Sequence, residues 1–317
     1  MAPPVPHGSR ILLTGASGQV GHELLIRLSR LGQVTAPPRS RLDLASAESI
    51  RAAVRSLQPT VIINAAAYTA VDRAESDSQV AMAVNATAPG VLAEEAGRCR
   101  ALLVHYSTDY VFDGAKRTPY REEDQTGPLN EYGRTKLLGE QRVATEGGAY
   151  WIVRSGWIYG WRGRNFLLNM LRLGSEREEL RIVDDQVGTP TSAAAIAEAT
   201  LQLLEHHQQA ADQAYEQACG MAGIYHAACS GETSWFRFAR AIFDHARKPG
   251  GWAELKVRRV IPITTAEYPT PARRPGYSVL CKDKITRAFG LQFPGWEDDL
   301  ATVMKRLAQS ALEETVS

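Results

Sequence analysis

Residues 10–21 read RILLTGASGQVG, an apolar run that leads into three glycines at intervals of three residues. The run Arg10–Thr14 predicts a buried strand. From Gln19 to Leu31 apolar residues recur at the helical period, which predicts a helix directly after the glycines. The stretch therefore predicts a strand–turn–helix unit, from which parallel sheets with covering helices are built.

The glycines of this turn have separate roles. Gly15 permits a sharp turn, Gly18 leaves room for a pyrophosphate to approach the backbone, and Gly21 lets the helix lie close to the sheet. The free N–H groups and the positive dipole at the helix N-terminus favour phosphates. A plain strand-to-helix turn is the alternative, but the position between the first strand and the first helix favours a dinucleotide site. The expected cofactor contacts in this turn are Gly15, Ser17, Gly18, Gln19, Val20 and Gly21.

Strand and helix patterns continue to alternate up to about residue 160. Further strands are predicted at Gln33–Ala36, Thr60–Asn64, Ala101–Ser107 and Ala149–Ser155, and helices from Ser46, over Ser78–Arg100 and from about Asn130 to Thr145. This order of elements predicts an α/β fold with a doubly wound (Rossmann) parallel sheet.

The alternation weakens in the second half of the chain. Helices are predicted at Ser192–His207, Ser234–Arg247 and Trp296–Leu312, and a strand at Gly223–Ala228. We expect residues 10–160 to form an NAD(P)-binding domain and residues 161–317 to form a smaller α+β substrate-binding lobe. A return of residues 180–200 to the first domain is left open.

The composition excludes several classes of partner. Among 317 residues, 36 Lys and Arg balance 35 Asp and Glu, so no global field holds nucleic acid or an anionic membrane. The four cysteines are widely spaced and form no C-x-x-C pair, which favours reduced thiols over disulfides or a zinc site. The apolar runs are too short to span a bilayer, and Met1–Arg10 lacks the features of a signal peptide. We expect a cytoplasmic protein.

The segment after the second predicted strand bears on the choice between NAD and NADP. Residues 37–41 are PPRSR, with no acid before Asp43 to accept the ribose hydroxyls of NAD. Arg39 and Ser40 are suited to a 2′-phosphate, and a solvated basic loop is the alternative. The segment favours NADP (NADPH), with use of NAD left open. Asp43 and Leu44 are expected at the adenine.

Tyr132 and Lys136 are candidates for proton transfer. They lie four residues apart at the start of a predicted helix, so both point to one face. An ammonium beside a phenol lowers the pKa of the phenol, which then gives a proton to a carbonyl oxygen as hydride arrives. The lysine also reaches the nicotinamide ribose. The Y-x-x-x-K spacing alone is weak evidence, and an exposed helix pair is the alternative. Its position after the fourth strand, where doubly wound sheets bind ligands, favours catalysis.

Ser107, Thr108 and Asp109 end the fourth predicted strand. Thr108 is suited to donate a hydrogen bond to a substrate carbonyl, and a turn or cap role is the alternative. Asp109 is either an N-cap or a partner that orients its neighbours. Together with the tyrosine and lysine, these residues predict a carbonyl-reducing site.

The chain resembles the extended short-chain dehydrogenase/reductases, and within them the branch that reduces a 4-keto dTDP-sugar. The resemblance runs from about Ile11 to Leu312. Its carriers are TGASGQVG (14–21), NAAAYTAVDRAES (64–76), VNATAP (84–89), STDYVFDG (107–114), PLNEYGRTKLLGE (128–140), RSGWIYG (154–160), NF (165–166), DDQVGTPTS (184–192) and YPTPARRPGYSVL (268–280). The segments STDYVFDG, DQVGTPT and ARRPGYS are specific to this branch.

The resemblance implies NADPH-dependent reduction of the C4 ketone of dTDP-4-dehydro-β-L-rhamnose to dTDP-β-L-rhamnose, the last step of dTDP-rhamnose biosynthesis. The implied catalytic set is Thr108, Tyr132 and Lys136. Implied cofactor contacts outside the glycine turn are Ala65, Ala66, Ala67, Tyr132 and Lys136. Implied contacts of the nucleotide-sugar are Thr69, Val71, Thr108, Asp109, Trp157, Arg274 and Ser278. A flat indole suits a sugar face and an arginine suits a diphosphate. Core packing of Trp157 and a solvated Arg274 are the alternatives.

One departure from the family concerns magnesium. Some members bind this ion between subunits through acids that follow the GxPT motif, together with an acid of the first helix. Glu23 is present here, but residues 192–195 read SAAA and the next carboxylate is Glu198. We therefore expect no metal, and a homodimer is left open.

Two other functions compete with reduction. An extended-type nucleotide-sugar epimerase or dehydratase retains NAD tightly and often needs extra acid–base groups beside the threonine, whereas here Asp109 and Tyr110 follow Thr108. A non-catalytic binding subunit, like the regulatory subunit of methionine adenosyltransferase, has the same fold without the chemistry. The complete set of Thr108, Tyr132 and Lys136 argues against the binding subunit.

Overall fold

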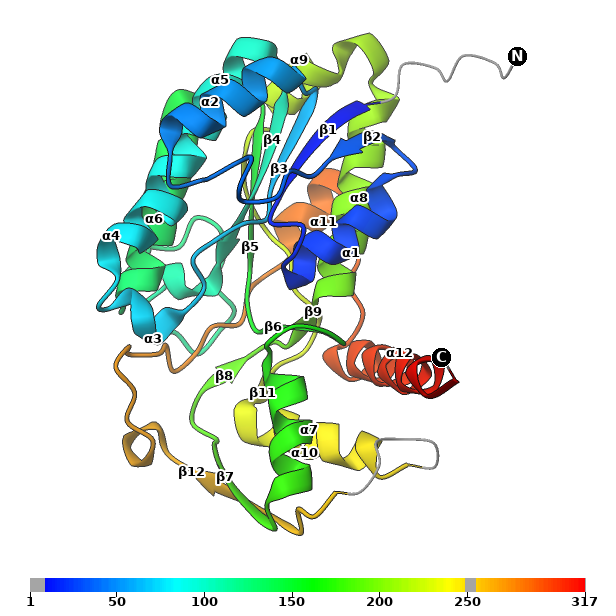
Figure 1. Cartoon of the computed structure of the whole chain (residues 1–317). Helices are drawn as coiled ribbons and strands as arrows, with labels where there is room; N and C mark the ends of the chain where they lie inside the picture. The colour runs from blue at the N-terminus through cyan, green and yellow to red at the C-terminus, as the bar shows by residue number, and fades with distance from the viewer. Residues whose placement is uncertain (1–8, 249–254, 317) are drawn as a thin grey trace.

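A six-stranded parallel sheet forms the centre of the computed structural model, which describes residues 9–248 and 255–316 (Figure 1). The strands lie in the order β10-β5-β4-β3-β1-β2, and every neighbouring pair is parallel. Their bounds are β1 Ser9–Thr14, β2 Gly32–Thr35, β3 Val61–Asn64, β4 Leu102–Thr108, β5 Tyr150–Ser155 and β10 Gly223–His226. The chain reverses its direction of travel across the sheet between β1 and β3, which is where such sheets bind ligands.

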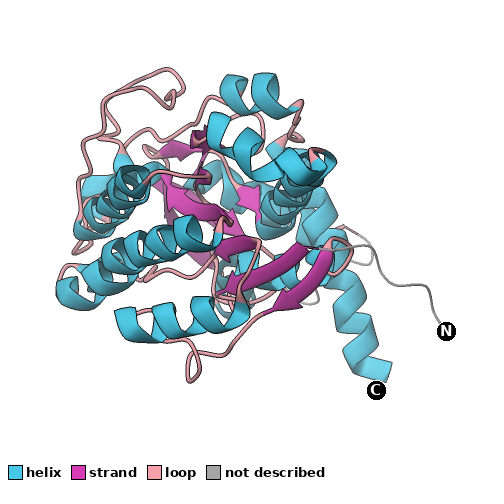
Figure 2. Ribbon diagram, turned by 90° about the horizontal axis from the view of Figure 1, so that it is seen from above, coloured by secondary structure: helices cyan, strands magenta, loops and turns pink. Residues whose placement is uncertain are grey.

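Helices cover both faces of this sheet, as the view from above shows (Figure 2). The bounds on one face are α2 Ala47–Leu57, α5 Ala88–Cys99 and α6 Glu131–Glu146, and on the other α1 Gln19–Leu28, α8 Ala193–Gln209, α9 Ala214–Gly220 and α11 Asp283–Phe289. Alternate strand residues serve the two cores. Leu12 and Ile62 face α2 and α5, whereas Leu13 and Ile63 face α1 and α8. The predicted doubly wound α/β fold is confirmed.

A second lobe lies below the carboxyl ends of the strands in Figure 1. Its elements are β6 Ile158–Tyr159, α7 Phe166–Glu176, β7 Glu179–Val183, β8 Val187–Gly188, β9 Thr191–Ser192, β11 Thr233–Ser234, α10 Trp235–Ala246, β12 Arg259–Ile263 and α12 Trp296–Val316. Short strands pair as β7 with β12, β8 with β11 and β6 with β9. Leu167, Leu171, Phe238 and Phe243 are fully buried in its core.

The chain crosses between the lobes more often than we expected. We assigned Gly223–Ala228 to the second lobe, but β10 pairs with β5 and completes the central sheet. Helices α8 and α11 also return, and their residues Ile196 and Ile285 are buried in the core on the α1 side. The reason is the apolar edge of β5, which needs a partner strand and covering helices to satisfy its backbone and exclude water. Of the N-terminal segment Met1–Arg10, which lacks the features of a signal peptide, residues 1–8 lie outside the described residues.

The helix predicted over Ser78–Arg100 is interrupted by a turn of π-helix. The segment divides into α4 Ser78–Met82, the π-helical η1 Ala83–Thr87 and α5. Such turns occur frequently at functional sites, and this one carries the buried side chain of Asn85. The remaining short elements are α3 Val71–Ala74 and the 3₁₀ turns η2 Asp109–Val111, η3 Ala211–Gln213 and η4 Thr265–Glu267. None of the helices within residues 9–248 and 255–316 is long and apolar enough to cross a bilayer.

Candidate active site

The glycine turn between β1 and α1 is shaped by close backbone contacts. Gly15 has φ +71°, and a Cβ atom there would lie 2.6 Å from the backbone nitrogen of Ala66. A Cβ atom on Gly21 would lie 2.0 Å from the carbonyl oxygen of Gly15. A Cβ atom on Gly18 would meet only that same oxygen, at 3.2 Å. Protein packing therefore requires glycine at positions 15 and 21, whereas Gly18 leaves room for a ligand.

The first turn of α1 has free backbone N–H groups and no acidic side chain. Gly18 occupies the N-cap and contributes no side-chain acceptor, and no acid stands in the first turn. The N–H groups at this end are therefore available, and no carboxylate competes with a phosphate. Ala65–Ala67 follow β3 and pass directly against Gly15. The structure thus brings the predicted glycine turn and the predicted alanine loop together, and their shape fits the diphosphate of a dinucleotide.

The basic segment after β2 lies at the surface. The side chain of Arg39 is 81% exposed, and its Nε lies 3.7 Å from the Asp43 carboxylate. Water screens such a pair, so it holds the guanidinium weakly and leaves it available for another anion. Leu44 is buried in the core beside α2. The contacts predicted for these residues with a cofactor stay predictions.

Helix α6 delivers Tyr132 and Lys136 to the carboxyl end of β4. The Oδ1 atom of Asn130 accepts a hydrogen bond of 2.8 Å from the backbone N–H of Gly133 and so caps the helix. A Cβ atom on Gly133 would lie 2.2 Å from the carbonyl oxygen of Tyr110, so only glycine lets α6 start against η2. Tyr132 is thereby placed beside Thr108.

The protonation states of this pair differ from our expectation. Burial raises the pKa of Tyr132 to about 12, and Asp109 adds to this effect although the hydrogen bond with Thr108 opposes it. Burial lowers the pKa of Lys136 to about 8 against the charge of Glu140. The expected lowering of the Tyr132 pKa by Lys136 was wrong, because the amine donates to the carbonyl oxygen of Tyr106 at 2.5 Å. Tyr132 is thus a protonated phenol at neutral pH, as a proton donor requires.

Thr108 and Asp109 form a buried pair beside the phenol. The Thr108 hydroxyl donates to Asp109 Oδ1 at 3.1 Å and accepts from the backbone N–H of Tyr110 at 3.2 Å. Burial raises the pKa of Asp109 to about 6, although hydrogen bonds from Ser278 and Thr108 lower it. Ser278 is thus buried beside Asp109, and its contact with the substrate stays a prediction.

Several buried oxygens around this pair have no partner among the described residues. They are Ser107 Oγ, Asp109 Oδ2 and Ser155 Oγ, all at the ends of β4 and β5. Buried polar atoms without hydrogen bonds are costly and rare. Their grouping here indicates that this end of the sheet is built to face a polar ligand.

Trp157 is held in a strained conformation beside the site. Its φ of +50° is unusual for a residue with a side chain. The indole stacks on Trp235 with ring centroids 3.4 Å apart and an interplanar angle of 2°. Gly188 lies against the same ring, since a Cβ atom there would be 2.3 Å from it. Trp235 lies 78 positions from Trp157 in the chain, at the start of the helix predicted over Ser234–Arg247, and was not predicted at the site.

Arg274 is paired differently from our expectation. Its guanidinium makes two hydrogen bonds to the carboxylate of Asp72, of 2.8 and 3.1 Å. Asp72 lies in α3 next to Val71, and the Asn130 side chain donates to the carbonyl oxygen of Arg273 at 2.7 Å. The late loop is therefore fastened to the first domain. Thr69, which we expected at the substrate, is exposed at the entrance to this segment.

Asn85 is a further residue that the sequence analysis did not assign. Its side chain bonds both the backbone N–H and the carbonyl of Tyr68, at 2.8 and 3.0 Å, and donates to Thr135 Oγ1 at 3.2 Å. It thus joins the loop after β3 to the helix that carries Lys136. The residue lay within a quoted motif, but no local pattern shows that a helix widens to a π turn.

The comparisons with known proteins agree with this geometry. The sequence model of the RmlD substrate binding domain family matches residues 9–309. The chain belongs to this family. A dTDP-4-dehydrorhamnose reductase of Burkholderia thailandensis is 49% identical over 90% of this chain and 95% of its own length. The enzyme of the same name from Escherichia coli K12 is 40% identical over 94% and 97%. The Bacillus anthracis enzyme of that name, solved in complex with NADP, superposes with a TM-score of 0.84 at 35% identity over 94% and 99%.

Some members of the family bind magnesium near the position of Glu23, so the surroundings of Glu23 show whether this chain fits the ion. Glu23 is buried, and its carboxylate accepts hydrogen bonds from Arg27, Arg306 and Trp161, at 2.5, 3.0 and 2.6 Å respectively. Burial alone would raise the pKa of Glu23, but these donors outweigh it and lower the pKa. Two guanidinium groups thus already neutralise this acid. The residues around Glu23 do not fit a bound cation, and within the described parts of the chain no three His, Cys, Asp or Glu side chains gather to form one.

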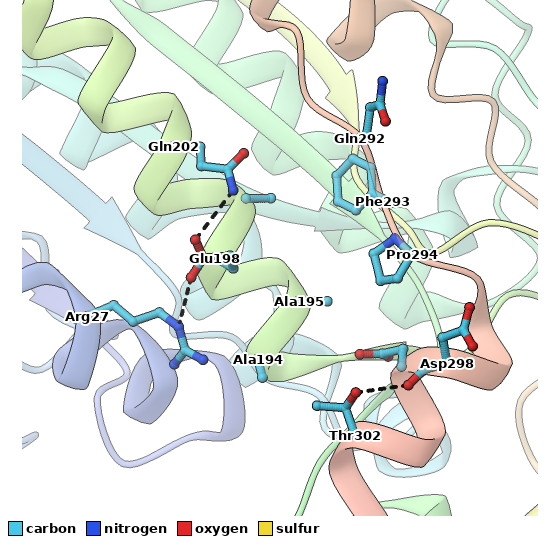
Figure 3. A pocket seen from close by; sticks show the side chains of 12 residues that line it. Arg27, Ala194, Ala195, Glu198, Gln202, Gln292, Phe293, Pro294, Asp298 and Thr302 are labelled. Carbon is cyan, nitrogen blue, oxygen red and sulfur yellow. Dashed lines mark hydrogen bonds and ion pairs between the residues drawn. The ribbon is translucent and has the colours of Figure 1, made fainter.

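A pocket of about 280 Å³ lies next to this cluster, between α1, α8 and α12 (Figure 3). Several polar groups of its wall bond one another. Glu198 lies 3.5 Å from Arg27 and accepts from Gln202, and the Asp298 carbonyl accepts from Thr302. None of the residues that line it belongs to the predicted active site.

Proposed function

We propose that this chain reduces the C4 ketone of dTDP-4-dehydro-β-L-rhamnose to dTDP-β-L-rhamnose with NADPH. The observation that carries the proposal is the position of Tyr132 and Lys136 on α6 beside Thr108, at the sheet end that adjoins the glycine turn. Curated relatives across the whole length of the chain are named for this activity. The expected family and the expected class of NADP-dependent oxidoreductase are confirmed.

The glycine turn and α1 hold the diphosphate of the cofactor, and Arg39 and Ser40 bind its 2′-phosphate. When bound, NADPH supplies the hydride for the ketone carbon. Tyr132 donates its proton to the ketone oxygen, and Thr108 donates a hydrogen bond to the same oxygen. Lys136 has a pKa of about 8 and is therefore mostly charged at neutral pH, and its ammonium binds the ribose of the nicotinamide.

The nucleotide-sugar lies between the two lobes in this proposal. Trp157 faces the sugar, while Asp109 and Ser278 lie next to the reacting ketone. Thr69 and Val71 contact the substrate from the loop before α3. The Asp72–Arg274 pair holds the late loop over the site, so Arg274 acts on the substrate by positioning that loop.

We further propose a cytoplasmic location and a homodimer. All four cysteines are free thiols, which suits a reducing compartment. Leu25 and Ile26 are 39% and 51% exposed on α1 and offer an apolar surface that a second copy would cover. Light scattering from the purified protein measures the oligomeric state, and a monomer mass at all concentrations would contradict the homodimer.

An absorbance assay at the nicotinamide band tests the reaction. The keto-sugar dTDP-4-dehydrorhamnose is generated in situ, and NADPH and NADH are compared. We expect consumption of one NADPH for each sugar reduced, with NADPH preferred over NADH. Epimerisation or dehydration without net consumption of NADPH would overturn the proposal in favour of the alternative enzyme class. The absence of any ketone reduction would favour a binding subunit.

A further inference from the structure

The loop between β6 and α7 rests on the cofactor end of α1. Trp161 Nε1 donates to Glu23 at 2.6 Å, and Asn165 Nδ2 donates to Gln19 Oε1 at 3.0 Å. A Cβ atom on Gly163 would lie 3.3 Å from the side chain of Gln19. The second lobe therefore covers the first helical residues after Gly18.

Arg162 lies between these two anchors. Its carbonyl oxygen accepts from Asn165 Nδ2 at 3.0 Å, which fixes the backbone. Because its neighbours Trp161 and Asn165 bond Glu23 and Gln19, Arg162 lies against the first turns of α1. Burial lowers the pKa of His22 in this helix, and the positive charge of Arg162 adds to that effect. Arg162 Nη1 is buried and has no hydrogen-bond partner among the residues that the structure describes.

The neighbouring carboxylate does not serve as the counter-charge. Glu23 follows His22 in α1, and its two oxygens accept from Arg27, Arg306 and Trp161. Burying a guanidinium nitrogen without a partner is unfavourable, and a charge-assisted hydrogen bond to a phosphate would offset this cost. The same helix end presents free N–H groups and no acid in its first turn. The loop that carries Arg162 and the N-terminal end of α1 thus lie together, and each offers N–H groups that suit an anion.

We propose that Arg162 binds the diphosphate of the dinucleotide, so that the second lobe contributes a cation to the cofactor site. This inference rests on the proposed use of NADPH. Because NADPH and NADH share the diphosphate, Arg162 contributes equally to both. Arg39, by contrast, acts only on the cofactor that carries a 2′-phosphate.

The test measures dissociation constants by nicotinamide fluorescence, without any sugar. We expect Arg162→Gln to weaken the binding of NADPH and NADH alike by about tenfold or more, the effect of losing one charge-assisted hydrogen bond. Adenosine 2′-monophosphate, which lacks the diphosphate, binds Arg162→Gln and the wild type equally, as judged by competition with NADPH. Arg164→Gln is the matched control, since Arg164 is exposed on the same loop. It is expected to bind both dinucleotides as the wild type does.

Three results would overturn the inference: dinucleotide binding to Arg162→Gln within twofold of the wild type, an equal loss in Arg164→Gln, or an equal loss for adenosine 2′-monophosphate. If Arg162→Gln does not fold, the dinucleotide affinity of Arg162→Lys tests the inference instead. This variant keeps the charge but loses the planar fork, so we expect intermediate affinity, and wild-type affinity would contradict the inference. Because no sugar is present, a different substrate would leave these results intact. A wild type that binds no NADPH would refute the proposed function itself.

Discussion

Replacing Glu140 by glutamine would leave Arg154 without its charged partner inside the protein. The two side chains are each 2% exposed and share two hydrogen bonds, of 2.9 and 2.7 Å. The other groups near the guanidinium are weak substitutes, namely the Glu122 carbonyl at 3.4 Å and the face of Phe112 at 5.0 Å. Breaking such a pair from one side costs about 3 to 5 kcal/mol, because the remaining charge stays buried. We predict a loss of this size in the free energy of unfolding of Glu140→Gln.

Urea unfolding followed by tryptophan fluorescence measures the change. The exposed pair of Arg172 and Glu176 supplies the control, and Glu176→Gln is expected to cost less than about 0.5 kcal/mol. The double variant Glu140→Leu with Arg154→Met removes both charges, so it should be more stable than Glu140→Gln. The reasoning would be refuted if Glu140→Gln cost no more than Glu176→Gln, or if the double variant were the least stable of the set.

Three other predictions concern the site. Gly15→Ala is expected to abolish NADPH binding, measured by nicotinamide fluorescence, since its Cβ would lie 2.6 Å from Ala66. Gly97→Ala is the control, because its Cβ meets nothing within 4 Å, and it should bind NADPH as the wild type does. Burial holds the Asp109 pKa at about 6 against an ordinary 3.8, so the stabilisation from its protonated form is complete below pH 3.8 and is lost as pH rises through 6. Urea unfolding should show that the unfolding free energy of Asp109→Asn, relative to that of the wild type, increases by about 3 kcal/mol as the pH rises from 3.8 to 6. A difference that does not depend on pH would contradict this prediction. Asp72→Asn should raise the KM for the nucleotide-sugar by about tenfold with little change in kcat, because it frees the loop that Arg274 fastens; steady-state kinetics in which only kcat fell would argue otherwise.

The local patterns of the sequence predicted the sheet and the first half of the site. Each strand of the first domain was located within two residues. For the inner strands the reason is that a strand buried on both faces needs a continuous apolar run. The glycine turn could also be predicted, since the spacing of its three glycines between a strand and a helix is a local pattern. The contact of Gly15 with Ala66, about 50 residues further along the chain, could not be predicted from that pattern. Tyr132 and Lys136 were singled out because helical spacing places them on one face and because they follow the fourth strand.

Contacts between segments far apart in the sequence could not be predicted from local patterns. Asp72 and Arg274 are 202 residues apart, and no periodicity connects them. The stacking of Trp157 on Trp235 and the return of β10 to the sheet likewise depend on the packing of the two lobes. The pKa of Tyr132 was mispredicted for a related reason, because burial and the carbonyl partner of Lys136 are properties of the folded chain.

The central claim is that Tyr132 donates the proton to the reduced ketone. Turnover by Tyr132→Phe, measured with NADPH and dTDP-4-dehydrorhamnose, tests it most directly. We predict a fall in kcat of about 10² to 10⁴-fold, as expected for the loss of a general acid, while the dissociation constant for NADPH stays at the wild-type value. A kcat within a few-fold of the wild type would show that another group supplies the proton and would contradict the account.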